Sequence, residues 1–207
     1  LLFKPGEPYR HRVVLETERL LRANDYLYDA VIAPVAYDGR TVDLEVRTRD
    51  VWTLNPGVSF SRKGGENTWG AQIEEDNLLG TGRALDFEWQ SDVDRESFGV
   101  SYFDPHFRHS FTRLGVAYID ADDGSTKLLQ VNRPFYALDT RRAGGVYLLE
   151  YERNDPRYVL GDEVGEFQHR GEYYEAYAGI SRGLEGRCVL RWTAGLTYER
   201  NRFAIAP

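Results

Sequence analysis

The sequence predicts a mainly β protein, with a small α/β unit followed by a long antiparallel meander. Alternating apolar and polar residues recur from residue 58 onward, and turns rich in Gly and Asp separate them. The clearest passage runs from Trp69 to Gly82, where a strand with Trp69, Ala71 and Ile73 on one face ends in an acidic turn. No apolar run approaches the roughly 18 residues of a transmembrane helix, but transmembrane strands alternate and need no such run.

Composition excludes some classes of function. The 207 residues carry a formal net charge of -7, with charges of both signs interspersed, which argues against a phosphate-binding surface for nucleic acid. The single cysteine, Cys188, cannot form an internal disulfide, and its alternating neighbours predict a small apolar residue on one face of a strand. Because the sequence begins at Leu1 and contains no methionine, we expect it to be a piece of a longer protein.

The first 54 residues predict a compact helix-strand-strand unit. Apolar residues near helical spacing predict a helix over 11–24, and a strand should follow at about 28–37. Pro34 predicts an edge strand or a bulge, and Asp38-Gly39 predicts a hairpin turn before a strand that starts near Val42. Asn55-Pro56-Gly57 should break regular structure, which places the domain boundary at about residue 55.

The remaining residues predict about nine antiparallel strands. The last one is the clearest, with Cys188, Leu190, Trp192, Ala194, Leu196 and Tyr198 on one face. It is long enough to span a bilayer at a tilt, although a soluble sandwich strand would alternate in the same way. The predicted strands are 58–63, 67–77, 83–91, 97–103, 111–120, 126–135, 143–153, 167–182 and 187–203.

Several motifs together resemble the BamA/TamA superfamily of outer-membrane proteins, also called the bacterial surface antigen family. Arg19–Arg22, Tyr26–Asp29 and Asp38–Val46 are similar to the last helix and final two strands of a POTRA (polypeptide-transport-associated) domain. The turn Glu75–Gly82, the segment Tyr102–Phe107 and the segment Pro134–Thr140 are similar to parts of the family's barrel.

The resemblance implies a fold and a compartment. Residues 1–54 would be a partial POTRA-like domain in the periplasm, and residues 55–207 would be the N-terminal half of a transmembrane β-barrel in the outer membrane of a Gram-negative cell. A family barrel has sixteen strands, so the closing half would lie outside this sequence. The open half alone would leave two unpaired edges.

The resemblance also implies assembly, insertion or translocation of other polypeptides through backbone strand pairing. Its partners would be outer-membrane lipid, unfolded or exported polypeptide clients and periplasmic accessory proteins. The first barrel strand, predicted to be short and flanked by glycines, would form one side of a weak seam where client strands pair. The predicted seam residues are Val58, Ser59, Phe60 and Ser61.

Two other functions stay open. Aromatic side chains could line the cavity of a ligand-binding β-barrel, either soluble or embedded in lipid. The chain could also be the barrel part of an outer-membrane enzyme whose catalytic domain lies outside this sequence. Within these residues we expect no catalytic, cofactor or metal site, and therefore no enzyme.

Three clusters of polar residues are candidates for such a site. His106 and His109 stand three residues apart near Asp104, but a hydrated rim is the favoured interpretation over a metal site. Asp120 to Gly124 is better interpreted as a turn than as a calcium loop. Glu74 and Glu75 point to opposite faces of a strand, which prevents paired acid–base chemistry. His11 and His169 stand alone, and Gly144-Gly145 is interpreted as a bend.

Overall fold

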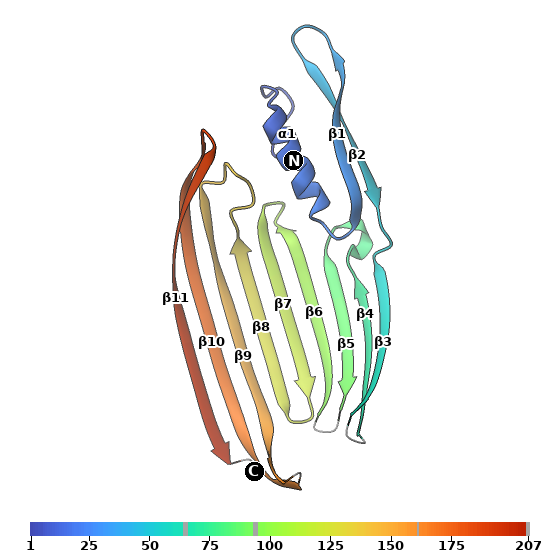
Figure 1. Ribbon diagram of the computed structural model, residues 1–207, viewed down its shortest axis with the longest axis vertical. Helices are drawn as coiled ribbons and strands as arrows, with labels where there is room; N and C mark the ends of the chain where they lie inside the picture. Colours follow the sequence, from blue (N-terminus) through green and yellow to red (C-terminus); the bar gives the residue numbers. More distant parts are fainter. Residues whose placement is uncertain (64–65, 93–94, 161, 206–207) are drawn as a thin grey trace. The chain divides into compact units, whose positions relative to one another are not determined.

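The fold is mainly β, as predicted, with one α-helix followed by antiparallel strands (Figure 1). The computed structural model describes residues 1–63, 66–92, 95–160 and 162–205. The chain divides into two compact units, Leu1–Thr53 and Leu54–Pro207. The described residues contain no helix long and apolar enough to cross a membrane.

The first unit consists of α1 (His11–Arg22), β1 (Leu27–Tyr37) and β2 (Val42–Asp50), with β1 and β2 paired antiparallel. Val14 of α1 is buried, as are Ala30 and Ile32 of β1, and these three residues form the apolar core of the unit. The helix therefore packs one face onto the hairpin through small and branched side chains.

Buried polar groups also tie the helix to its surroundings. Thr17 is only 1% exposed; its hydroxyl oxygen accepts the N–H of Leu2, outside the helix, at 3.3 Å and donates to the carbonyl of Val13 within the helix at 2.7 Å. The buried carboxylate of Glu18 accepts the N–H of Ile32 at 2.6 Å. Because a buried carboxylate without a partner is costly, this bond fixes how α1 sits against β1.

The predicted irregularity at Pro34 is confirmed, since the register of β1 against β2 shifts between Pro34 and Ala36. The predicted turn at Asp38-Gly39 is also confirmed. Asp38 Oδ1 accepts the N–H groups of Arg40 at 2.8 Å and Thr41 at 2.6 Å, and Gly39 has a φ of 93°. Glycine suits that left-handed conformation because it has no Cβ.

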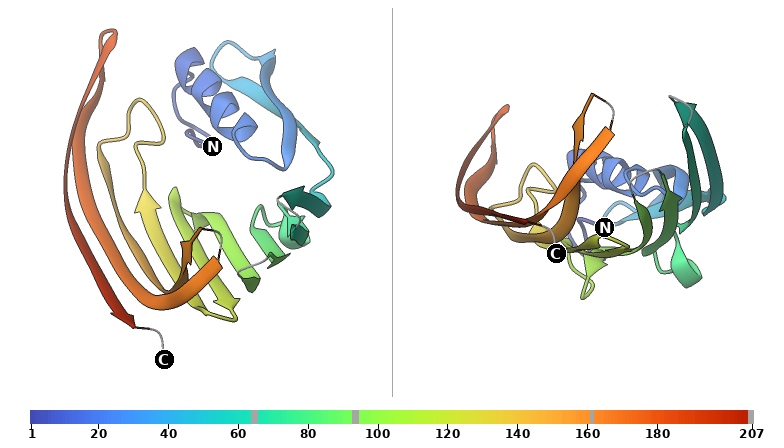
Figure 2. Two further views of the ribbon diagram at one scale, coloured as in Figure 1. Left: turned by 60° about the horizontal axis from the view of Figure 1, so that its bottom comes forward. Right: turned by 90° about the horizontal axis from the view of Figure 1, so that it is seen from below.

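The second unit is a nine-stranded sheet in the order β11-β10-β9-β8-β7-β6-β5-β4-β3, so every strand pairs with its neighbour in sequence. Figures 1 and 2 show this meander and its curvature, which makes one face of the sheet concave and the other convex. The strands are β3 (Leu54–Lys63), β4 (Glu66–Glu75), β5 (Ala84–Ser91), β6 (Glu96–Phe107), β7 (Thr112–Ala121), β8 (Gly124–Arg133), β9 (Arg142–Val159), β10 (Asp162–Glu185) and β11 (Cys188–Ile205).

The sequence prediction for the start of the first sheet strand, at residue 58, is wrong. Asn55-Pro56-Gly57 does not break the chain but lies inside β3, which therefore has ten residues and is as long as β4. Proline is tolerated there because β3 is an edge strand, where a missing N–H costs no sheet hydrogen bond. The seam strand is not short, and Gly64 and Gly65, predicted to flank it, lie outside the described residues.

Two further sequence predictions are wrong. Gly144 and Gly145 do not form a bend but pair with β8 and β10 inside β9. A Cβ on Gly145 would stand 2.6 Å from Cβ of Asn132, so glycine is required by close strand packing. The strand predicted over 167–182 also ends later than expected, since β10 continues to Glu185 past a register irregularity between Ser181 and Leu184.

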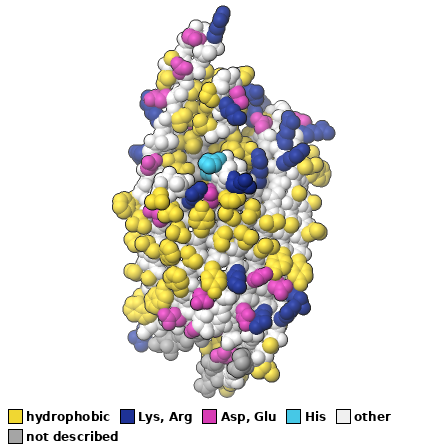
Figure 3. Space-filling view, turned by 180° about the vertical axis from the view of Figure 1, so that it is seen from behind, with side chains coloured by type: hydrophobic (Ala, Val, Ile, Leu, Met, Phe, Trp, Pro, Cys, Tyr) yellow, Lys and Arg dark blue, Asp and Glu magenta, His cyan; other side chains and the backbone are white. Residues whose placement is uncertain are grey.

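The second unit lacks a closed apolar core of its own. Among its described residues, Ala137 is the one apolar residue classed as buried, whereas Val58 is 90% exposed and Leu196 is 83% exposed. Figure 3 shows the convex face, where hydrophobic side chains form a broad band between two rims that contain charged groups. A folded sheet that displays its large apolar residues in this way needs a further apolar environment to cover them.

Candidate functional site

The strand register divides the side chains of the sheet into an apolar outer set and a polar inner set. Register partners in neighbouring strands share a face, so the pairs Val58–Ala71, Ile73–Phe87 and Leu148–Tyr174 place these residues together. The outer set is called the belt here. It comprises Val58, Phe60, Trp69, Ala71, Ile73, Leu85, Phe87, Trp89, Phe98, Val100, Tyr102, Leu114, Val116, Tyr118, Leu129, Val131, Val146, Leu148, Tyr174, Ala176, Ala178, Ile180, Leu190, Trp192, Ala194, Leu196 and Tyr198.

The belt runs obliquely to the register of the strands. Ala71 lies at the middle of the belt on β4, and successive register partners lead from it through Phe98 and Glu152 to Arg202 on β11. The middle of the belt on β11 is Ala194, which lies eight residues before Arg202. The belt therefore shifts by about one residue per strand across seven strand steps.

That shift corresponds to a strand tilt. With a rise of about 3.3 Å per residue and about 4.8 Å between strands, one residue per strand gives a tilt of about 35–40° from the normal to the belt. Strands in membrane barrels are tilted by about 35–45°. If the belt lies parallel to a membrane plane, the strands must therefore be tilted from the membrane normal by an angle like that of strands in membrane barrels.

The inner set is polar and rich in small residues. On β4 and β5 it places Gln72 opposite Glu88 and Glu74 opposite Asp86. The register also confirms that Glu74 and Glu75 lie on opposite faces, because Glu75 pairs with Leu85 of the belt. The concave face is therefore suited to contact with water.

A hollow of about 360 Å³ lies along β8, β9 and β10. Tyr147, Tyr173 and Tyr177 supply its aromatic wall, and Glu175 supplies a carboxylate. Oδ1 of Asn132, another lining residue, is buried and has no hydrogen-bond partner. This hollow is where the ligand-binding alternative would place its aromatic site, but it is broad and open to the concave side.

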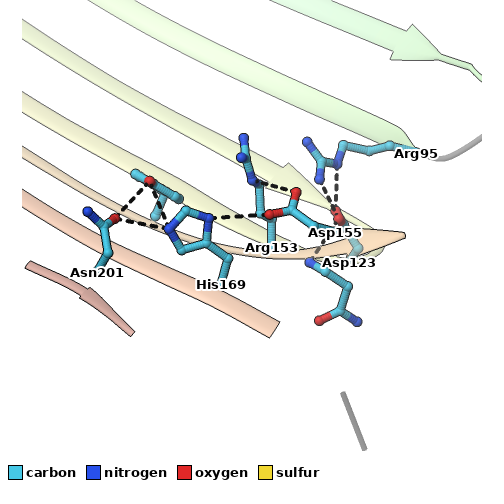
Figure 4. A network of polar contacts seen from close by, with 8 residues as sticks. Arg95, Asp123, Arg153, Asp155, His169 and Asn201 are labelled. Atoms are coloured by element: carbon cyan, nitrogen blue, oxygen red, sulfur yellow. Dashed lines mark hydrogen bonds and ion pairs between the residues drawn. The ribbon is translucent and has the colours of Figure 1, made fainter. Parts of the chain in front are cut away.

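β9 continues past Glu152, its last residue paired with β8, to Val159. At this end of the sheet, polar contacts connect residues far apart in sequence (Figure 4). Nδ1 of His169 lies 3.3 Å from Oδ2 of Asp155, and Nε2 lies 3.0 Å from Oδ1 of Asn201. Tyr151 packs edge-on against the His169 ring, and Phe203 stacks on it. His169 is therefore not the isolated residue that the sequence suggested.

The same figure shows Arg95 and Asp123, which come from two different hairpin turns. Nε of Arg95 lies 2.7 Å from Oδ1 of Asp123, and Oδ2 of Asp123 accepts the N–H of Asn154 at 3.1 Å. These partners are 28 and 31 residues apart, so no local spacing in the sequence could have revealed them. Asp122 and Asp123 occupy the hairpin turn between β7 and β8, as the turn interpretation predicted.

The acidic turn after β4 is held by its own side chains. Oε1 of Glu75 accepts the N–H of Asn77 at 2.8 Å, and Oδ1 of Asn77 accepts the N–H of Gly82 at 2.7 Å. Arg83, directly after the turn, forms an ion pair of 3.2 Å with the buried Asp104. These carboxylates and amides stabilise a connection between strands.

The histidine pair considered for a metal takes part in other contacts. The N–H of His106 donates to Asp104 at 2.9 Å, and its ring packs against Phe111. Within the described residues, no group of three or more His, Cys, Asp or Glu side chains is arranged to hold a metal ion. Cys188 is exposed on the outer face.

The four predicted seam residues lie in the middle of β3, the edge strand that pairs only with β4 among the described strands. Val58 and Phe60 belong to the belt, and the Phe60 ring lies 4.5 Å from the ring of Trp69. Ser59 and Ser61 face the concave side. Among the described strands none pairs with the other side of β3, so the backbone of residues 58–61 can accept a further strand there.

In the first unit, hydrogen bonds set the ionisation of one exposed carboxyl group. The pKa of Asp38 lies below its ordinary value because the N–H groups of Thr41 and Arg40 and the Thr41 hydroxyl donate to the carboxylate. Burial raises the pKa of Tyr26, and the charge of Asp50 adds to that effect.

Comparison with solved structures shows what the fold of this chain is similar to. It is similar to the crystal structure of BamA from Haemophilus ducreyi lacking POTRA domains 1–3, with a TM-score of 0.50 and 16% sequence identity. The match covers 95% of this chain and 51% of that one, so the chain spans about half the length of that structure. No protein-family model and no curated protein sequence matches the chain. The similarity thus defines a BamA-like barrel fold.

Proposed function

We propose that residues 55–207 form part of the wall of an outer-membrane β-barrel, with residues 1–54 as a POTRA-like unit in the periplasm. The observation that carries this proposal is the inclined apolar belt on the convex face. It is continuous over nine strands, and its members include Val58, Trp192 and Leu196, which are each more than half exposed. Lipid is the environment that covers such a face.

The distribution of polarity favours lipid over a soluble ligand-binding barrel. A soluble barrel turns its apolar face inward, around the ligand or around packed side chains. In this sheet the apolar face is convex, and the concave face carries residues such as Gln72, Glu74 and Glu88. The Tyr-lined hollow therefore belongs to a polar lumen.

We further propose that the protein assembles or inserts other polypeptides through backbone pairing, without covalent chemistry. The motif resemblance and the BamA-like fold support this role. The edge position of β3 supplies a physical means, because an edge strand offers unpaired N–H and C=O groups to a client strand. Gly57, near the start of β3, has no side chain to pack and so weakens pairing with β4, which is compatible with an edge that exchanges partners.

The test uses photo-crosslinkers in the full-length protein at Ser59 and Ser61 of β3, with Ser101 of β6 as the control. Ser101 also lies on the inner face, but it is enclosed between β5 and β7. During assembly of a β-barrel client, adducts should form from β3 and not from Ser101. An actively assembling protein that gives no adducts from either β3 position would refute client pairing at this edge.

A further inference from the structure

One rim of the belt carries an unusual group of arginines. Arg133 ends β8, and Arg141 and Arg142 stand at the start of β9; Arg182 and Arg187 lie at the β10–β11 end. All five are exposed, and they are called the arginine rim here. Figure 3 shows Lys and Arg side chains gathered above one side of the hydrophobic band.

Arginines outnumber carboxylates in the stretch that contains the arginine rim. None of its members forms an ion pair within the part of the chain that the structure describes, although the guanidinium of Arg133 donates to the hydroxyl of Tyr136 at 3.3 Å. Two carboxylates lie in the same stretch, Asp139 and Glu185, and the first accepts the N–H of Leu184. The stretch is therefore net positive.

The opposite rim of the same strands differs. There Arg170 forms an ion pair with Glu152 at 2.9 Å, and Arg200 stands opposite Glu172 in register. The charges on that rim compensate one another within the sheet. The two ends of β8–β11 thus differ in electrostatics: one rim of the belt is net positive, and the other carries paired charges of both signs.

The arginine rim is continuous with the belt. Arg142 is the register partner of Ile180, which is the register partner of Trp192, so these three side chains form one row on the outer face. Ile180 is 65% exposed and Trp192 is 66% exposed. Guanidinium groups directly beyond an apolar band, beside an exposed tryptophan, match the level of lipid headgroups.

We propose that the arginine rim binds the phosphate groups of anionic phospholipids in the adjoining leaflet and enriches them around β8–β11. This inference rests on the proposed membrane role of the belt. Arginine suits the task because its planar guanidinium donates two parallel hydrogen bonds to phosphate oxygens and keeps its charge. Basic groups close to an anionic lipid surface attract it electrostatically, and salt weakens that attraction.

Trp192 provides a built-in reporter for the test. The full-length protein, with every other tryptophan replaced by phenylalanine, is reconstituted in phosphatidylcholine vesicles that contain a small fraction of brominated lipid. The brominated lipid is either phosphatidylglycerol or phosphatidylcholine at the same fraction. Local enrichment predicts about twofold stronger quenching of Trp192 by the brominated phosphatidylglycerol, reduced at high salt.

Two sets of variants sharpen the test. Replacing all five arginines of the arginine rim with Gln should make the two lipids quench equally, whereas replacing the same five residues with Lys should retain most of the difference. A protein with Trp89 as its only tryptophan serves as the control. Trp89 pairs with Phe98 on the belt far from these arginines and should show no preference.

The outcomes separate this inference from the proposed function. Equal quenching of Trp192 by both lipids in the unmodified rim overturns lipid binding by these arginines and points to another acidic partner. Absence of quenching by either lipid overturns the membrane role of the belt as well. Stronger quenching by phosphatidylglycerol that survives the change to Gln also overturns the assignment to these residues.

Discussion

Arg95 and Asp123 join two hairpin ends of the sheet through a two-point ion pair, with Nε of Arg95 2.7 Å from Oδ1 of Asp123. The Asp123 side chain is only 12% exposed, and its second oxygen also accepts the N–H of Asn154. One carboxylate therefore holds the turn before β6, the turn before β8 and the extension of β9.

Asp123→Asn should destabilise the sheet by about 1–3 kcal/mol, because an amide nitrogen would face N–H donors that the carboxylate now satisfies. The measurement is the free energy of unfolding by urea for the full-length protein in detergent micelles. Asp43→Asn, an exposed change on β2, is the matched control and should alter stability little. Equal effects of both changes would contradict the bridging role of Asp123.

Gly179→Ala should displace the segment between β8 and β9. A Cβ at this position would stand 2.8 Å from the ring of Phe135, which itself lies under the guanidinium of Arg191. We expect a loss of about 1–3 kcal/mol in unfolding free energy, as for other overpacked sites.

The effect of Gly179→Ala should shrink when Phe135 is also replaced by Ala, because the ring is then absent. Gly57→Ala is the control, since its nearest atom would be Cβ of Gln72 at 3.9 Å. If the double variant loses as much as the sum of both single changes, contact with Phe135 is not the cause.

The hairpin turn at Asp38 should depend on pH. Its folded pKa is lowered by hydrogen bonds, so its stabilising contribution is complete above the unfolded pKa of about 4 and is lost as pH falls through the folded value. The protection factors of the Arg40 and Thr41 amides, which correct for the intrinsic pH dependence of hydrogen exchange, should therefore fall on acidification. In Asp38→Asn that acid dependence should disappear, and if it persists the carboxylate is not its origin.

Neighbouring residues on β11 test the two faces of the sheet. Leu196 lies on the belt opposite Ala176, and Thr197 lies on the concave face opposite Glu175. Leu196→Arg should impair folding into lipid vesicles by about 2–4 kcal/mol, because it places a charge in the hydrocarbon. Thr197→Arg should be tolerated, since it faces a polar lumen and an acidic neighbour. Folding can be followed by heat-modifiable mobility in gels, and equal tolerance of both variants would refute the lipid-facing assignment.

Local pattern was enough to predict most strands. Alternation such as Leu85, Phe87 and Trp89 against polar neighbours identifies a strand and its two faces without knowledge of its partners. Turn residues such as Asp38-Gly39 mark where a hairpin reverses. The errors fell where a residue's effect depends on its neighbours, as for Pro56, which is compatible with β3 only because that strand lies at an edge.

The candidate site was predictable only in part. The four seam residues were placed on the first strand of the sheet from order alone, and their role stays a prediction. The sequence did not predict the polar contacts of His169 with Asp155 and Asn201, or the ion pair of Arg95 with Asp123. These partners lie 14 to 32 residues apart, and no spacing rule connects residues at such distances.

The sequence by itself determined the class of structure, because alternation with a period of two and frequent turn residues are local properties of the chain. It also determined which side chains of each strand share a face. Only the tertiary structure decided the register between strands, and register is set by side-chain packing and backbone pairing between distant segments. Register in turn revealed that the apolar residues form one inclined belt, and that the arginines of β8–β11 gather along one of its rims.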